Sequence, residues 1–190
     1  GLSWYTMYDM TTFGFEKRNF ENVVSGIVQA IALAHKNVSQ GGRILLSTGK
    51  LLSSNINRSA AAYLMNPQAE RDRYPDGDTD KLMTLLRFED ESGKPVAMFN
   101  WFAVHGTSMN NTNQYISGDN KGFAAYMFEN QMNKNNLKGD FVAIFAQTNE
   151  GDVSPNTRGA TCPDGVTPCD ADSTCHGKTQ LCTAKGPGKD

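Results

Sequence analysis

Two nearly continuous apolar segments, Leu82–Phe88 and Val96–Val104, constrain the fold most, because only the turn-forming stretch EDESGK separates them. A short polar connection of this kind joins antiparallel strands into a hairpin. A third apolar run, Phe141–Ala146, is also predicted to be a strand. A nearly continuous apolar strand is typical of a sheet whose two faces are both covered by other elements of the fold.

Helical patterns alternate with these strands. Apolar residues recur with a period of about 3.6 between Phe20 and Ala34, which predicts an amphipathic helix. The segment from Lys121 to Met132 predicts a helix packed on the sheet, and residues 59–66 predict a short helix that stops at Pro67 and is followed by a charged loop. Residues 43–52 predict a strand or a hairpin. We therefore expect an α/β fold with mixed sheet layers flanked by helices.

The overall composition argues against some classes of function. The chain has 190 residues, a formal net charge of −2 and 20% charged residues, so no large basic surface predicts nucleic-acid binding. No apolar stretch approaches the length of a membrane span. The first residues lack the features of a signal peptide, and the last residues stop in a loop. We expect residues 1–190 to be part of a single domain of a longer polypeptide.

All four cysteines lie near the end of the chain, at positions 162, 169, 175 and 182. Zinc ribbons use paired C-x-x-C sequences, which are absent here. Evenly spread cysteines among proline, glycine and aspartate favour two disulfides, formed in an oxidising compartment, over a metal site. Residues 162–182 are therefore predicted to be a disulfide-stapled loop, within which His176 is exposed. The spacing leaves all three pairings open.

Three Asn-X-Ser/Thr sequences begin at Asn37, Asn57 and Asn110. They are compatible with secretion and N-glycosylation, because this sequence is the acceptor for glycans in secreted proteins. Such short motifs also arise often by chance.

His105 directly follows the second predicted strand, in the sequence WFAVHGTS. Functional side chains collect where strands end, because the loops there are free to vary. A histidine at such a point is a candidate metal ligand or general base. The alternative is a histidine whose ring is satisfied by backbone hydrogen bonds, and position alone favours neither.

Ser154 follows the third predicted strand, in the sequence GDVSPN. A serine hydroxyl needs an adjacent base or a metal-bound partner to become a nucleophile. The sequence is not G-x-S-x-G, so a nucleophile elbow is not indicated. Local sequence by itself favours an ordinary turn, and a catalytic serine is the sharper alternative.

Arg58 is the third candidate, in the sequence NINRS after the strand region at 43–52. A guanidinium among small polar residues is suited to stabilising an oxyanion or binding a substrate carbonyl or hydroxyl. The alternative is an ordinary surface ion pair. His35 is expected to be structural, since a cation at a helix C-terminus is favourable, and Asp119 is expected to cap the helix that follows it.

Taken together, four segments resemble the neutral (alkaline) ceramidases. In chain order they are INRSAAAYLMNPQAERDRY, NWFAVHGTSMNN, SGDNKGFAAYMFE and NEGDVSPNTRG, and the cysteine loop ending CTAKGPGKD resembles the eukaryotic and secreted members. The resemblance extends along almost the whole chain. It implies an enzyme that hydrolyses the amide of ceramide to sphingosine and a fatty acid, with a zinc-dependent centre at the bottom of a deep apolar pocket.

By this resemblance, His105 matches a zinc-ligand histidine, Ser154 matches the serine treated as the catalytic nucleophile, and Arg58 matches an active-site arginine. The family's other ligands are expected outside this segment: a histidine just before Gly1, and a glutamate and a tyrosine beyond Asp190. Since a zinc site needs about three protein ligands, the rest of the polypeptide is needed to complete it.

The resemblance also implies a mechanism and a setting. Zinc (Zn2+) would polarise the amide carbonyl or activate water. Arg58 would assist the oxyanion or anchor the polar head, and Ser154 would attack the carbonyl or only orient the substrate. Ceramide would be taken from a membrane or micelle surface by a secreted or cell-surface protein, and glycans are not expected at Asn57 and Asn110, near the inferred pocket. The alternatives are a catalytically silent extracellular binding module of the same fold and a zinc amidase for another N-acyl substrate.

Overall fold

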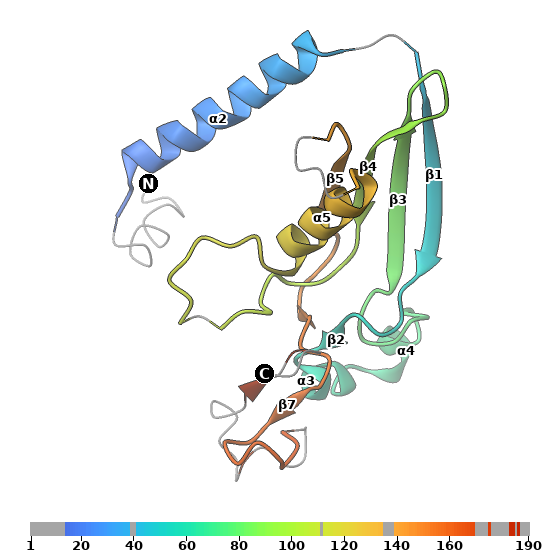
Figure 1. The fold of residues 1–190 in the computed structure, drawn as a ribbon. Helices are drawn as coiled ribbons and strands as arrows, with labels where there is room; N and C mark the ends of the chain where they lie inside the picture. Colours follow the sequence, from blue (N-terminus) through green and yellow to red (C-terminus); the bar gives the residue numbers. More distant parts are fainter. Residues whose placement is uncertain are drawn as a thin grey trace, which may run out of the picture. The chain divides into compact units, whose positions relative to one another are not determined.

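The computed structural model describes residues 14–38, 41–110, 112–134, 139–169, 175, 183–184 and 186. The chain divides into two compact units, Gly1–Gly41 and Gly42–Asp190. The first unit contains the helix α2, and the second contains the sheet and the other described elements (Figure 1).

The helix α2 (Lys17–Lys36) confirms the predicted amphipathic helix and extends it at both ends. The Glu16 carboxylate caps its N-terminus by accepting a hydrogen bond from the Arg18 backbone N–H (2.9 Å). His35 and Lys36 lie in its last turn, where positive charge is favourable, which supports a structural role for His35.

The apolar face of α2 is exposed, including Ile27 and Ile31. Amphipathic helices are stabilised mainly by packing of such a face. None of the helices in the described ranges, α2 included, has the length and apolarity needed to cross a membrane.

The second unit is built on a four-stranded mixed sheet with the spatial order β1, β3, β4, β5. Its strands are β1 (Arg43–Lys50), β3 (Leu82–Glu89), β4 (Pro95–Trp101) and β5 (Val142–Ala146). The β1–β3 and β3–β4 pairs are antiparallel, and the β4–β5 pair is parallel. All three predicted apolar strands are therefore confirmed, as is the α/β fold with a mixed sheet.

A tight turn closes the β3–β4 hairpin as the sequence predicts. The Asp90 carboxylate accepts hydrogen bonds from the backbone N–H groups of Ser92 (2.9 Å) and Lys94 (3.0 Å). Gly93 has a φ of 84°, in the left-handed region that glycine tolerates without a steric cost. These contacts lower the pKa of the Asp90 carboxyl, with the side-chain hydrogen bond from Ser92 as the largest cause.

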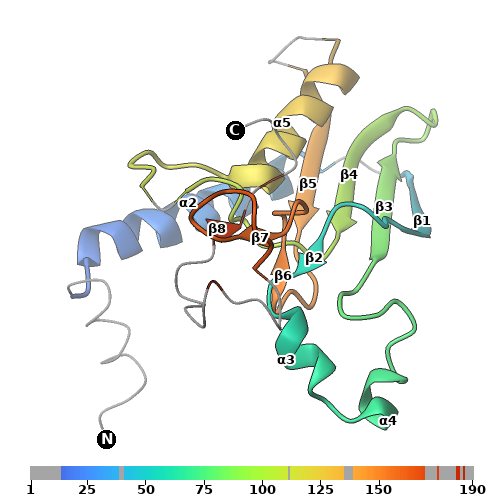
Figure 2. The same ribbon diagram turned by 90° about the horizontal axis from the view of Figure 1, so that it is seen from below.

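The helix α5 (Asp119–Met132) connects the parallel strands β4 and β5 and packs along β5 (Figure 2). The Phe128 ring lies 5.9 Å from that of Phe141 and 6.3 Å from that of Phe145. The buried core of this layer joins Met98 of β4 to Phe141 and Ala143. A helix between two parallel strands covers one face of the sheet, which agrees with the predicted packing of this helix.

Short elements surround the end of the sheet. They are β2 (Ile56–Asn57), α3 (Ala60–Leu64), α4 (Gln68–Arg71), β6 (Val153–Ser154), β7 (Ala160–Thr161) and β8 (Thr183–Ala184). The helix α3 confirms the predicted short helix. The prediction of a loop directly after Pro67 was wrong for α4. Pro67 is the N-cap of this helix, and its carbonyl accepts from the backbone N–H groups of Glu70 (2.9 Å) and Arg71 (3.2 Å).

The cysteine-rich loop contains a disulfide between Cys162 and Cys175. Cys169 is disulfide-bonded as well, and Cys182 lies outside the described residues. The Sγ atoms of Cys162, Cys169 and Cys175 lie within 4.8 Å of one another, a spacing compatible with a metal. Because these sulfurs are in disulfides, they are not the thiolates that bind zinc. The disulfide interpretation of this loop is confirmed.

Replacing both Cys162 and Cys175 by alanine in the full-length protein should lower the free energy of unfolding by about 3 kcal/mol, the loss expected for a loop of roughly 15 residues. The bridged cysteines are 13 residues apart, so the disulfide restricts a loop of this size in the unfolded chain. Urea unfolding followed by circular dichroism measures the change. An unchanged unfolding midpoint would show that the disulfide adds nothing to stability.

Candidate active site

The short strands β2 and β6 bring two distant parts of the chain together (Figure 2). They pair in antiparallel fashion, with Ile56 opposite Ser154 and Asn57 opposite Val153. The backbone N–H of Arg58 continues the ladder by donating to the Asp152 carbonyl (2.9 Å). Arg58 and Ser154 therefore lie on opposite strands of one ribbon, two register positions apart.

His105 is attached to the same ribbon through two hydrogen bonds. Its backbone N–H donates to the Val153 carbonyl (3.1 Å), and its ring Nδ1 lies 2.9 Å from the same oxygen. Since a carbonyl oxygen only accepts, Nδ1 carries the proton in this contact, and Nε2 is left as the basic nitrogen. The side chain is 39% exposed.

The structure thus brings all three candidates from the sequence to one place. Arg58 bonds to Asp152, His105 bonds to Val153, and Ser154 is the next residue along β6. The contacts that hold them are backbone hydrogen bonds, which are directional and fix the spacing of neighbouring strands. The three residues therefore form one candidate site.

Ser154 is buried, with 6% of its surface exposed. Its Oγ accepts a hydrogen bond from the Asn156 backbone N–H (3.1 Å), so the predicted serine turn is confirmed. That bond uses a lone pair and leaves the hydroxyl hydrogen free to donate. The turn and a chemical role are compatible at this position.

The Arg58 side chain is exposed, and its guanidinium makes no ion pair within the described ranges. Within these ranges, Arg58 therefore does not form the ordinary surface ion pair that the sequence left as the alternative. A guanidinium without an ion-pair partner in these ranges is suited to an anionic or carbonyl oxygen.

Two side chains that the sequence did not single out hold the ends of β4 and β5 together. The Lys121 ammonium donates to the carbonyls of Phe102 (2.8 Å) and Ala146 (3.0 Å), where the two strands end. The Gln147 side chain pairs with both the N–H and the carbonyl of Val104. This explains why β4 ends before the predicted Val104. The Phe102 N–H still donates to the Ala146 carbonyl of β5 (3.2 Å), but the carbonyls of the last three predicted residues accept from side chains rather than from a neighbouring strand.

Glu150 is a second charged group beside His105. Its Oε2 lies 4.0 Å from Nδ1 of His105 and has no hydrogen-bond partner among the residues that the structure describes. Burial lowers the pKa of Lys121, and the negative charge of Glu150 opposes this effect. No local pattern distinguished either residue, because both lie among other polar residues in the sequence.

Asn55 is a buried polar residue directly before β2, with 1% of its surface exposed. Its Nδ2 donates to the carbonyls of Ala103 (2.7 Å) and Asp80 (2.9 Å). Its Oδ1 accepts from the Thr79 hydroxyl (3.2 Å) and the Lys81 ammonium (2.6 Å). Asn55 thereby fixes the start of β2 against the segment that leads to His105.

The prediction that Asp119 caps α5 was wrong in detail. The N-cap is Gly118, and the Asp119 carboxylate bonds to the loop after His105 as well as to Asn120. Burial acts to raise the pKa of Asp119, but the hydrogen bonds from the backbone N–H groups of Met109, Asn120 and Ser108 outweigh it and lower the pKa. The carboxylate therefore stabilises the fold above its ordinary pKa, and this contribution is lost as the pH falls through the lowered value.

In two of the three glycosylation sequences, the asparagine side chain makes hydrogen bonds near the candidate site. The Asn57 amide donates to the Asp78 carbonyl (2.9 Å), and its oxygen accepts from the Ser59 N–H (2.6 Å). The Asn110 oxygen accepts from the Thr112 N–H (3.2 Å). Asn37, the third, is the C-cap of α2. Glycosylation itself stays a prediction.

The donor groups in the described ranges fit a zinc site in part. The tautomer of His105 fits a zinc ligand, because ligating histidines usually donate their other ring N–H to a carbonyl or carboxylate. In those ranges the cysteine group is the one set of His, Cys, Asp and Glu close enough to hold a metal, and it is disulfide-bonded. His105 fits zinc as one ligand of a site whose other ligands belong to other parts of the polypeptide.

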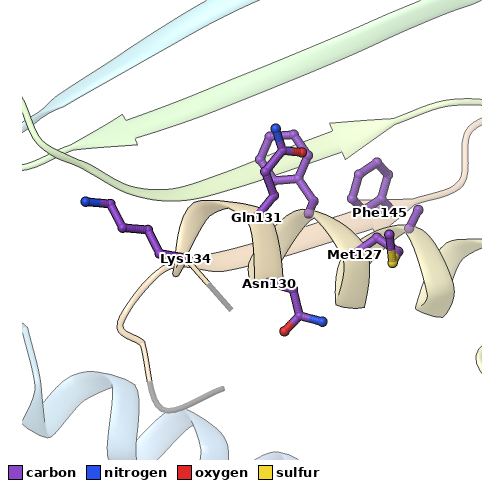
Figure 3. Close-up of a pocket in the computed structure, with 7 residues that line it drawn as sticks. Met127, Asn130, Gln131, Lys134 and Phe145 are labelled. Atoms are coloured by element: carbon purple, nitrogen blue, oxygen red, sulfur yellow. The ribbon is translucent and has the colours of Figure 1, made fainter. Parts of the chain in front are cut away.

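A hollow of about 560 Å³ lies along α5 (Figure 3). It is lined by Ala124, Met127, Phe128, Asn130, Gln131, Lys134 and Phe145. Because Ser154, Arg58 and His105 are not among its lining residues, the hollow is not the candidate active site.

The fold and the site together define an α/β protein in which polar side chains are held where the strands of the sheet end. This is the usual place for chemistry in such sheets. The chain belongs to the neutral/alkaline non-lysosomal ceramidase family, because the model of that family's N-terminal part matches residues 1–190.

Curated relatives agree with this assignment over the whole chain. Neutral ceramidase B of Dictyostelium discoideum is 54% identical over 193 residues, covering 100% of this chain and 26% of the relative. Neutral ceramidase of Drosophila melanogaster is 44% identical over 193 residues, covering 100% of this chain and 27% of the relative. The chain thus spans about a quarter of the length of these relatives.

Solved structures have the same fold. A ceramidase complexed with C2 matches with a TM-score of 0.70 and 39% identity, over 80% of this chain and 23% of the other. Neutral ceramidase from Pseudomonas aeruginosa matches with a TM-score of 0.69 and 33% identity, over 96% of this chain and 29% of the other. Both matches support the mixed α/β fold.

Replacing Asn55 by alanine in the full-length protein should lower the free energy of unfolding by at least about 2 kcal/mol. The change leaves the buried Ala103 carbonyl and the part-buried Asp80 carbonyl without their donor from Asn55, and an unsatisfied buried group costs about 1–3 kcal/mol. Urea unfolding measures the loss. Asn66→Ala is the matched control, because Asn66 is exposed. Equal stability of the two variants would contradict the role of Asn55.

Proposed function

We propose that this chain is the part of a zinc-dependent amidase that supplies His105, Ser154 and Arg58, and that the whole enzyme cleaves the N-acyl bond of ceramide to sphingosine and a fatty acid. The observation that carries the proposal is the attachment of His105 to the carbonyl next to Ser154, in a chain of the ceramidase family. The rest of the polypeptide is needed to complete the site.

His105 would hold zinc through Nε2, while its Nδ1–H remains bonded to the Val153 carbonyl. Zinc, when bound, acts as a Lewis acid on a carbonyl oxygen and lowers the pKa of a bound water to about 7. A histidine whose two ring nitrogens are used in this way has no free nitrogen. His105 is therefore not the base that removes the Ser154 proton.

Ser154 has two possible roles that its geometry supports. Its hydroxyl hydrogen is free, so it donates a hydrogen bond to a substrate oxygen or is removed when Oγ attacks the carbonyl. Burial of this serine excludes competing water from its hydroxyl. Attack requires a base from another part of the site, since His105 is occupied.

Arg58 would bind the oxygen on which negative charge develops, or the polar head of the substrate. Its guanidinium is positively charged at all relevant pH values and offers five donors. The neighbouring backbone is held by the Asp152 carbonyl, which keeps the side chain on the same ribbon as Ser154. Donors of this kind assist catalysis when they bind the charge that develops in the transition state.

The setting of the enzyme follows from its chemistry. Disulfides form and persist in oxidising compartments, so the disulfide between Cys162 and Cys175 supports a secreted or cell-surface protein. Ceramide is strongly apolar, so the enzyme would take it from a membrane or micelle surface into an apolar pocket completed by the rest of the polypeptide.

His105→Ala in the full-length protein should abolish stoichiometric zinc and ceramide hydrolysis, because one of about three protein ligands is removed. Elemental analysis of the purified protein measures the metal, and release of sphingosine measures turnover. His35→Ala, in the last turn of α2, is the control and should keep both. Wild-type protein with neither zinc nor turnover would support a silent binding module. Zinc with turnover of another N-acyl compound alone would identify a different amidase.

Ser154→Ala should lower kcat by at least about 10³-fold if Oγ is the nucleophile, since no other group can form the covalent intermediate. The full-length enzyme should keep its zinc, because Ser154 is not a ligand in this proposal. Ser25→Ala, an exposed serine of α2, is the control. Substantial turnover by Ser154→Ala would reject the nucleophile and leave the orienting role.

A further inference from the structure

The loop that follows His105 is held by the first turn of α5. The Asp119 carboxylate accepts hydrogen bonds from the backbone N–H groups of Ser108 (3.0 Å, to Oδ1) and Met109 (2.9 Å, to Oδ2). Each carboxylate oxygen therefore accepts a hydrogen bond from a residue ten or eleven positions earlier in the chain. A helix cap would instead bond mainly to N–H groups of its own helix.

The neighbouring Asn120 bonds to His105 itself. Its Nδ2 donates to the His105 carbonyl (2.8 Å) and lies within hydrogen-bond distance of the Ser108 hydroxyl (3.0 Å). His105 is consequently held at three polar atoms: its N–H and Nδ1 by Val153, and its carbonyl by Asn120. The Nε2 atom is the one polar atom of His105 to which the described residues give no partner.

The backbone at Asp119 is also unusual. Its φ is 50°, in the left-handed region that a non-glycine residue seldom adopts. Asp and Asn tolerate this region better than other side chains, and such conformations collect at functional sites. This conformation occurs at the residue whose carboxylate binds the loop after His105.

We propose that Asp119 and Asn120 are positioning residues that direct Nε2 of His105 toward the metal. The inference rests on the proposed function, because it needs His105 to be a zinc ligand. Asp119 acts on the loop after His105, and Asn120 acts on the His105 carbonyl. Together they oppose rotation of the His105 backbone, which Val153 alone holds from only one side.

The experiment compares zinc retention among variants of the full-length protein. Asp119→Ala and Asn120→Ala should each lose zinc to a competing chelator more readily than the wild type, with a metal affinity about 10-fold to 100-fold lower, the range found when groups that orient metal ligands are removed. Their kcat should fall while KM changes little, because neither side chain is placed against substrate. The visible spectrum of the cobalt-substituted protein should change with them.

Two further variants separate positioning from general stability. Asp119→Asn keeps one accepting oxygen and a tolerance for positive φ, so its zinc release should lie between those of the wild type and Asp119→Ala. Asp90→Ala is the matched control, because the Asp90 carboxylate also accepts two backbone N–H groups but lies in the β3–β4 turn. It should lose stability without faster zinc release.

The outcomes distinguish this inference from the proposed function. Wild-type protein that holds no zinc would overturn the proposed function and the inference with it. Zinc in the wild type with unchanged release from both alanine variants would overturn the inference alone. So would equally fast release from Asp90→Ala, because the effect would then follow from lost stability. If Asp119→Ala fails to fold, Asp119→Asn and Asn120→Ala decide the question by the same measurement.

Discussion

The Val153 carbonyl is the acceptor on which the candidate site depends. It receives both the backbone N–H and the Nδ1–H of His105, at 3.1 and 2.9 Å. Because Val153 belongs to β6, the same dipeptide that carries Ser154 also fixes the histidine. The pairing of β6 with β2 then adds Arg58 to the same ribbon. One backbone oxygen in a short ladder thus relates residues that are widely separated in the chain.

Polar side chains make this arrangement possible where the central sheet ends. Where a strand ladder ends, backbone groups no longer have ladder partners, and such groups are costly when buried. Lys121 and Gln147 satisfy these groups at the ends of β4 and β5, and Asn55 satisfies others next to β2. The segment leading to His105 is consequently buried although it is not a strand.

The local sequence predicted most of the regular elements, and its failures have clear causes. Apolar runs and helical spacing predicted β3, β5 and α5, because burial of one face is encoded by residue period. The end of β4 was predicted too late, since its last apolar residues are buried but bond to side chains. The helix cap assigned to Asp119 was wrong because its acceptor atoms serve a loop that no local pattern connects to it.

By itself, the sequence determined the strands, the main helices, the disulfide character of the cysteine loop and three candidate residues of a recognisable family pattern. It left open whether the histidine ring was satisfied by the backbone and whether the serine formed a turn. The tertiary structure answered that both hold: Nδ1 of His105 and Oγ of Ser154 each bond to the backbone. Local patterns report burial and backbone preference, whereas the pairing of β2 with β6 depends on long-range hydrogen bonds that form only when the sheet has brought the segments together.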